Sequence, residues 1–195
     1  MDIGKGAGLS GASGVRPFLP ALLAGALARG NHGVDFSGTS YSFLERSWFL
    51  LIVLALAFAA YALDRRAESR KQKAEGRGPV ALVSALCGLV LGALLFAGAL
   101  ADKHHTSWWG LVAGVACAAL GYFALAALFE RARRRISGGA AALIGVYADG
   151  VALALAGISI AVGPVAYAAL VVFVLLLVRS RGEGAQKFEG LRILR

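Results

Sequence analysis

Residues 80–101, VALVSALCGLVLGALLFAGALA, form a continuous apolar stretch without a charged side chain. A helix needs about 20 such residues to cross a hydrocarbon core of about 30 Å. The stretch therefore predicts a membrane-spanning helix, and the composition agrees. Of the 195 residues, 58% are hydrophobic and 16% are charged, whereas about 25% are charged in soluble domains. We expect an all-α, polytopic membrane protein, which excludes a secreted disulfide scaffold, a cytosolic nucleotide-binding enzyme and a nucleic-acid module.

The apolar pattern divides the chain into six predicted spans within one integral membrane domain. Their ranges are 8–28, 47–63, 80–101, 107–129, 139–161 and 164–178. The first span is the weakest, because the half up to Pro17 is rich in Gly, Ser and Pro and is a poor regular helix. We expect this first helix to be broken or re-entrant. Gly163-Pro164 divides the last apolar run, which is too long for one pass, into a tight hairpin.

Lysine and arginine are concentrated in every second connection. Six of the 20 lie in the loop 64–79, four in the loop 130–138 and five in the tail 179–195. Basic residues in short loops stay on the cytoplasmic side. We therefore predict that both termini lie in the cytoplasm. The net charge of +9 mostly reflects this topology, although the basic loops are also expected to attract anionic lipid heads.

Small residues indicate how the helices pack. Gly88 and Gly92 form one Gly-x-x-x-Gly face, and Gly110 and Gly114 form another. Such faces let helix backbones approach closely inside a membrane. They serve either packing within the monomer or a homo-oligomer, and we favour the first. The string Ala-Gly-Ala-Leu-Ala occurs at 24–28 and again at 97–101, so the chain contains either repeated helical hairpins or a chance recurrence.

Two charges fall inside predicted spans. A charge in the hydrocarbon costs at least about 2.5–3.5 kcal/mol and usually needs a partner or a water-filled cavity. Arg16 and Asp149 lie at similar depths, roughly 12 Å and 15 Å from the cytoplasmic ends of their spans. We predict that they face each other, either as a structural ion pair or as a substrate-binding site.

The residues around Arg16 are candidates for a polar pocket. Gly14 and Pro17 would loosen the helix beside it, and irregular backbone at membrane depth is tolerated only where it is buried in protein or lines a cavity. Hydroxyl groups from Ser10, Ser13 and Tyr147 would complete the pocket.

Other chemistry is not expected. His104 and His105 are adjacent in a short loop, where a solvated turn is favoured over a metal site. Cys87 and Cys117 lie in apolar spans and are expected to be reduced, packed side chains. The sequence contains no P-loop, no dinucleotide fingerprint and no metalloprotease helix. We predict no cofactor, no bound metal and no nucleic-acid partner. A lipid enzyme would need a second catalytic group near Arg16.

The first predicted span also carries a family resemblance. Residues 12–20, Ala-Ser-Gly-Val-Arg-Pro-Phe-Leu-Pro, are similar to the Gly-x-Arg-x-Phe-Leu-Pro segment of a bacterial family of small multi-pass membrane proteins, the domain of unknown function 4126. The acidic-basic pairs Asp64-Arg65 and Glu130-Arg131, and the tail 187–195, support the resemblance. The resemblance implies a location in the inner membrane of a bacterium and the importance of the Arg16 segment, but no activity.

The sequence thus predicts a small membrane transporter or channel whose substrate has an anionic group that binds Arg16, with Asp149 as the counter-charge. The alternative is a non-transport membrane protein, either a lipid-interacting scaffold or a subunit of a larger complex, in which the two charges only lock the bundle. A polar, water-accessible surface at Arg16 would favour transport.

Overall fold

The computed structural model describes residues 2–30, 32–69, 79–101, 107–135 and 140–189. In this part of the chain the structure is all-helical, as predicted, and contains no strand. Its elements are α1 (Asp2–Val15), α2 (Phe18–Arg29), the 3-10 helix η1 (Ser42–Glu45), α3 (Ser47–Ser69), α4 (Pro79–Ala101), α5 (Ser107–Arg135), α6 (Ala140–Ala161) and α7 (Val165–Glu189).

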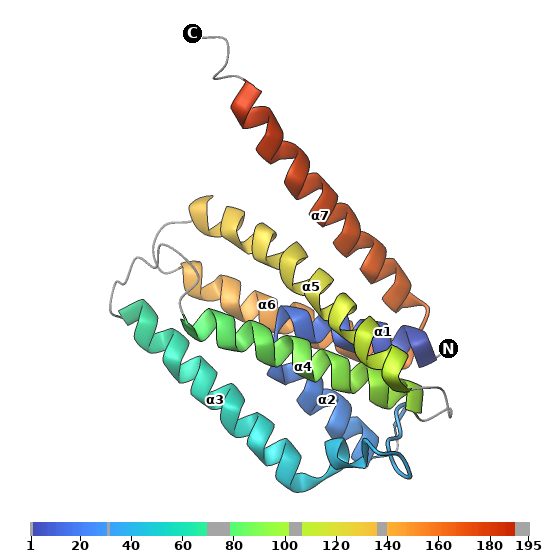
Figure 1. Cartoon of the computed structure of the whole chain (residues 1–195). Helices are drawn as coiled ribbons and strands as arrows, with labels where there is room; N and C mark the ends of the chain where they lie inside the picture. Colours follow the sequence, from blue (N-terminus) through green and yellow to red (C-terminus); the bar gives the residue numbers. More distant parts are fainter. Residues whose placement is uncertain (1, 31, 70–78, 102–106, 136–139, 190–195) are drawn as a thin grey trace.

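The chain reverses direction between α1 and α2. The α1 helix ends beside Arg16, whose backbone N–H donates to the carbonyl of Ala12 at 3.1 Å. Proline at 17 lacks an N–H group and ends the helix. At the far end of the hairpin, Lys5 Nζ donates to the carbonyl of Gly33 at 2.6 Å. The predicted break is therefore confirmed, and α1 and α2 form a helical hairpin with its tip at residues 16–17 (Figure 1).

The two ends of the bundle differ. One end, called the loop end, holds the start of α1, the loop 30–46 and the α6–α7 turn at Gly163. The opposite end, called the basic end, is where α3, α5 and α7 run into the predicted basic segments (Figure 1). The α1 helix starts at the loop end and α7 runs away from it. Asp2 and Glu189, the first and last residues that the structure describes, therefore lie toward opposite ends of the bundle. The prediction that both termini are cytoplasmic stays a prediction.

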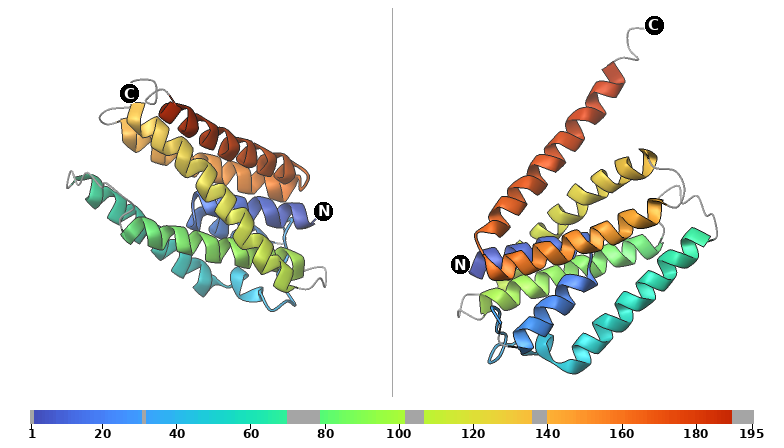
Figure 2. Two further views of the ribbon diagram at one scale, coloured as in Figure 1. Left: turned by 45° about the horizontal axis from the view of Figure 1, so that its top comes forward. Right: turned by 180° about the vertical axis from the view of Figure 1, so that it is seen from behind.

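The first helix lies at the centre of the bundle. Residues 6–14 are all buried, and α1 packs against α4, α5, α6 and α7 (Figure 2). Its glycines lie in these contacts: a Cβ atom at Gly8 would overlap Ser159 of α6, and one at Gly14 would overlap the carbonyl of Ala118 in α5. The expectation of a poor regular helix here is wrong, because small side chains allow four helices to surround α1 closely.

Glycine faces also join α4 to α5 and to α1. A Cβ atom at Gly114 would lie 2.7 Å from Cα of Ala93, and one at Gly110 would lie 2.8 Å from Cα of Ala97. A Cβ atom at Gly88 would lie 2.8 Å from the carbonyl oxygen of Ser13. Gly92 is buried against Ser10 and Ala118 in the same way. These four glycines therefore pack inside the monomer, which is the alternative that we favoured.

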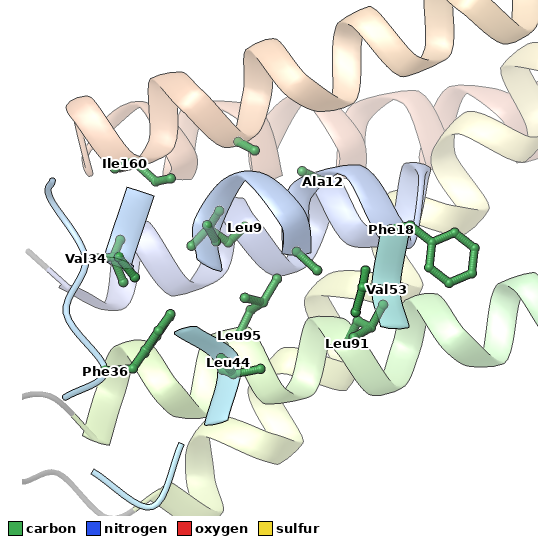
Figure 3. Close-up of a cluster of buried hydrophobic side chains, with 14 residues drawn as sticks. Leu9, Ala12, Phe18, Val34, Phe36, Leu44, Val53, Leu91, Leu95 and Ile160 are labelled. Atoms are coloured by element: carbon green, nitrogen blue, oxygen red, sulfur yellow. The ribbon is translucent and has the colours of Figure 1, made fainter. Parts of the chain in front are cut away.

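A side-chain plug closes the loop end. Phe36 and Leu44 from the loop 30–46 are 0% and 1% exposed, and they cluster with Leu9 and Leu95 (Figure 3). The two Ala-Gly-Ala-Leu-Ala strings receive this plug: Gly25 meets the backbone of Leu44, and Gly98 meets the ring of Phe36. Both strings therefore have the same packing role, whether or not they arose by duplication.

The predicted spans and the observed helices agree closely in their first residues. The helices α3 to α7 begin within one residue of the predicted starts, and the break at 162–164 separates α6 from α7. Three of these helices continue beyond the predicted ends: α3 to Ser69, α5 to Arg135 and α7 to Glu189. Hydropathy marks the apolar part of a helix, whereas basic residues such as arginine are good helix formers and extend it.

Helices capable of spanning a bilayer are fewer than predicted. In the described part of the chain, only Leu82–Ala101 and Trp108–Ala126 are both long and apolar enough. The apolar stretches of α2, α3, α6 and α7 are 10–17 residues long. A bundle of six spans is therefore not confirmed, and residues 8–28 form a hairpin rather than a span.

Candidate functional site at the hairpin tip

Arg16 and Asp149 meet at the tip of the α1–α2 hairpin. Arg16 Nε lies 2.7 Å from Asp149 Oδ1, and Arg16 Nη2 donates to the carbonyl of Gly145 at 3.2 Å. The predicted contact is therefore present in the structure. The side chains are 32% and 36% exposed, so α1 and α6 hold the pair together without enclosing it.

The contact has a different geometric origin from the one expected. The sequence argument measured both depths from the cytoplasmic ends of the spans, whereas α1 enters from the loop end. Arg16 is about 14 residues along α1 from Asp2, and Asp149 is about 12 residues from Ala161, which places both roughly 18–21 Å from the loop end. The depths still match, because both helices have an end at the same face of the bundle.

The predicted pocket residues do not gather around the pair. The Ser10 hydroxyl donates to the carbonyl of Gly114 at 2.5 Å, and the Ser13 hydroxyl donates to Leu9 of its own helix at 2.9 Å. Both serines are fully buried, and Tyr147 is 70% exposed. Gly14 packs onto α5. The hydroxyl pocket is therefore wrong, because the serines serve the α1 contacts and Tyr147 lies on the outer face of α6.

Two helix ends lie beside Arg16, the end of α1 at Val15 and the start of α2 at Phe18. Pro17 occupies the N-cap position of α2, with no side-chain hydrogen bond to cap the helix. The start of α2 therefore points its first N–H groups and the positive end of its helix dipole toward the hairpin tip. Pro20 is accommodated in this first turn, where proline costs little. The end of α1 presents its last carbonyl groups and the negative end of its dipole at the same tip, so the two helix ends offset each other there.

Sequence reasoning missed two participants. The first is Gly145, which lies one helical turn before Asp149 and offers its carbonyl to Arg16. Residues four apart share a helix face, so the spacing was visible, but nothing in the sequence marks a carbonyl as an acceptor for a distant arginine. The second is Lys5, whose bond to Gly33 ties α1 to the loop end.

The remaining candidates give no metal or redox site in the described part of the chain. No group of three or more His, Cys, Asp or Glu side chains is placed to hold a metal ion among the described residues. Cys87 and Cys117 are free thiols. His104 and His105 lie outside the described residues. In the loop 30–46, the hydroxyl and then the backbone N–H of Ser37 lower the pKa of Asp35, which marks a solvated turn.

Comparison with known proteins adds no relative. No protein-family model, curated protein or solved structure matches this chain. The resemblance of residues 12–20 to the uncharacterised bacterial family therefore stays a prediction, and the functional argument depends on the geometry alone.

Proposed function

We propose that the chain is a multi-pass membrane protein in which α3 to α7 cross the bilayer around the re-entrant hairpin. Large hydrophobic side chains along these helices support this, since they are exposed on the outside of the bundle. Phe58 is 67% exposed, Trp109 70% and Leu175 61%. Soluble monomers rarely expose contiguous apolar surface of this extent. Trp48, Trp108 and Trp109 lie near the loop end, where indole rings favour a membrane interface.

Within this setting we propose a transporter or channel that binds an anionic group at Arg16. The observation that carries the proposal is a charged pair, about one third exposed, at the break of a re-entrant hairpin. Asp149 lies roughly 14 Å from the start of α6 and roughly 18 Å from its end. A partly exposed charge at that depth needs polar surroundings, and broken helices at membrane depth typically line substrate pathways.

A proposed mechanism follows from the contacts of Arg16. Asp149 neutralises the guanidinium while no substrate is present, which lowers the cost of keeping a cation in the membrane. An arriving anion then competes with Asp149 for the guanidinium and gains the first N–H groups of α2. The pair thus acts as a replaceable counter-ion, and release of the anion restores it.

A structural lock is the second candidate, and the bond from Arg16 to the carbonyl of Gly145 favours it. In that case the pair would fix α1 against α6 and would have no ligand. An ion pair by itself is weak evidence for function, so the two candidates need a test that separates stability from transport.

Flux through proteoliposomes provides this test. The probes are chloride and inorganic phosphate, each measured as efflux down its own gradient. We expect Arg16→Gln to reduce the flux by about 10–100-fold, which is the effect of losing one or two charge-assisted hydrogen bonds to the anion. The matched control is Arg29→Gln, because Arg29 is exposed at the loop end and donates to the hydroxyl of Ser47; its flux should equal that of the wild type.

The double variant Arg16→Gln/Asp149→Asn separates the two candidates. It removes both charges and retains side chains of similar shape, so the fold should persist, as a thermal unfolding curve would show. Transport predicts that its flux stays low. If the pair is only a structural lock, the wild-type protein itself should show no selective anion flux. A double variant that passes anions as fast as the wild type would contradict an anion site at Arg16.

A further inference from the structure

The ion pair at the hairpin tip is neutral as a unit, and the arrival of an anion changes that balance. Arg16 contributes one positive charge and Asp149 one negative charge, with 2.7 Å between Nε and Oδ1. An anion that binds the guanidinium adds one negative charge, whatever else surrounds the pair. An uncompensated charge at this depth of a membrane is costly. Binding therefore favours any step that removes a negative charge from the site at the same time.

The carboxylate of Asp149 is the partner that can lose its charge. A carboxylate takes up one proton and becomes neutral, whereas a guanidinium is not deprotonated in proteins. The neutral carboxyl group also has an O–H that can donate to the anion, in place of a carboxylate that repels it. About a third of each side chain is uncovered by the helices, so the water that brings the anion also brings the proton.

Arg16 keeps a partner on α6 while Asp149 is neutral. Its Nη2 donates to the backbone carbonyl of Gly145 at 3.2 Å, and this acceptor does not depend on the protonation of a side chain. Gly145 and Asp149 are four residues apart, so they share one face of α6. A proton on Asp149 therefore weakens the bond from the carboxylate and leaves the bond from Gly145. The guanidinium stays at the hairpin tip, where the anion binds it.

Other groups near the depth of Asp149 do not change charge in the same pH range. The helices that pack against α6 are α1, α2, α5 and α7. At a comparable distance from the loop end, counted along the helices, the described side chains of this set and of α6 include Arg16, Cys117, Tyr122, Tyr147 and Arg179. Arginine stays charged, and cysteine and tyrosine stay neutral, at and below neutral pH. Arg179 is exposed, on the part of α7 that diverges from α6 (Figure 1).

The titratable groups of the loop end lie farther from the pair. This end holds His32, Asp35 and Glu45, and also Lys5, which donates to the carbonyl of Gly33. The loop 30–46 meets α6 at Ile160, which is about 11 residues, or roughly 16 Å, from Asp149 along the helix. These groups can titrate without any contact with Arg16, and they therefore provide matched controls.

We propose that anion binding at Arg16 is coupled to the uptake of one proton by Asp149, so that the chain carries an anion and a proton together in the same direction. The proposal rests on the proposed function and names the ion that drives it. The proton comes from the water on the side where the anion binds. It returns to water on the other side, when the anion leaves and the carboxylate of Asp149 pairs with Arg16 again. The site is then neutral both with and without the anion.

Chloride flux in proteoliposomes tests the coupling, because chloride carries no proton of its own. Potassium and valinomycin hold the membrane potential at zero, and a dye inside the vesicles reports the pH. We expect an inward chloride gradient to acidify the lumen of vesicles that contain the wild-type chain, with one proton per chloride. With equal chloride on both sides, an inward proton gradient should accumulate chloride, at most about tenfold per pH unit. Chloride flux without proton movement would overturn the proposal.

The variant Asp149→Asn separates the two ions. Asparagine resembles the protonated carboxyl group in shape and charge, so chloride flux should persist and should no longer move protons. The matched controls are Asp35→Asn and His32→Gln, which remove titratable groups from the loop end and should couple the two ions as the wild type does. Coupling that survives in Asp149→Asn would show that another group binds the proton.

A measurement on the wild-type chain alone covers the case in which Asp149→Asn does not fold. Chloride added to the purified chain in unbuffered detergent solution should raise the pH, through the uptake of up to one proton per chain. The affinity for chloride should fall by up to about 100-fold between acid and alkaline pH, the factor that corresponds to one uncompensated charge. A chloride affinity that is independent of pH would contradict the coupling.

The outcomes also separate this proposal from the proposed function. Chloride flux that depends on Arg16 but moves no proton refutes the coupling and supports the anion pathway. Chloride-linked proton uptake in a chain that passes no chloride supports the link between the two ions and refutes anion transport. A chain that shows neither refutes both.

Discussion

Replacing Gly14 with alanine is expected to destabilise the protein by about 1–3 kcal/mol or more, the cost of adding atoms to a filled interior. A Cβ atom at this position would overlap the carbonyl oxygen of Ala118 and would lie 2.9 Å from the backbone N of Tyr122. These are backbone atoms of α5, which cannot rotate away as a side chain can. The methyl group must therefore push α1 from the centre of the bundle.

The matched control is Gly150→Ala in α6. A Cβ atom at Gly150 meets nothing within 4 Å, so the same substitution adds no contact there. Alanine is favoured over glycine in helices by about 0.8–1 kcal/mol, and Gly150→Ala should be neutral or slightly stabilising. Thermal unfolding in detergent measures both variants. Similar losses for the two would mean that α1 does not pack against α5 as described.

A second large loss of stability is expected for Phe36→Ala, about 3–5 kcal/mol, as for other buried aromatic side chains. Phe36 is fully buried with Leu44 at the loop end, and its ring fills the space left by Gly98 of α4. Its backbone N–H also donates to the carboxylate of Glu45. Truncating the ring leaves a hole in the plug that the glycine opposite cannot fill.

Phe58→Ala is the control, because it removes the same atoms from the exposed face of α3. Phe58 is 67% exposed, and in a bilayer its ring would exchange protein contacts for lipid at little cost. In the same detergent, the free energy of unfolding should be several kcal/mol lower for Phe36→Ala than for Phe58→Ala. A Phe36→Ala protein as stable as Phe58→Ala would show that the loop is not part of the folded core.

Much of the helical framework could be predicted from the sequence. Apolar stretches bounded by charges located the starts of α3 to α7, because desolvation of charges is the dominant cost in an apolar setting. The same reasoning selected Arg16 and Asp149, which the structure brings within 2.7 Å. A charged side chain inside an apolar segment needs a partner of opposite charge, and few charged residues lie inside the apolar segments of this chain.

The position of α1 could not be predicted in this way. Hydropathy and helix propensity treat glycine as a weak helix residue, so residues 8–17 suggested an irregular segment. In the structure these glycines are favourable because four other helices pack closely against them. The contacts come from segments far along the chain, so the local sequence of α1 does not indicate them. The serines were misassigned for the same reason: Ser10 looked like a pocket group, but its partner is a carbonyl of α5.

The central place of α1 has a consequence for the order of assembly. The helix precedes α4, α5, α6 and α7 in the chain, yet those four form the walls of the space that it occupies. Because its own apolar surface is small, α1 gains little from lipid and cannot adopt its final position until the later helices are present. The earliest of these helices to be synthesised is therefore expected to be among the last to become protected from hydrogen exchange during folding.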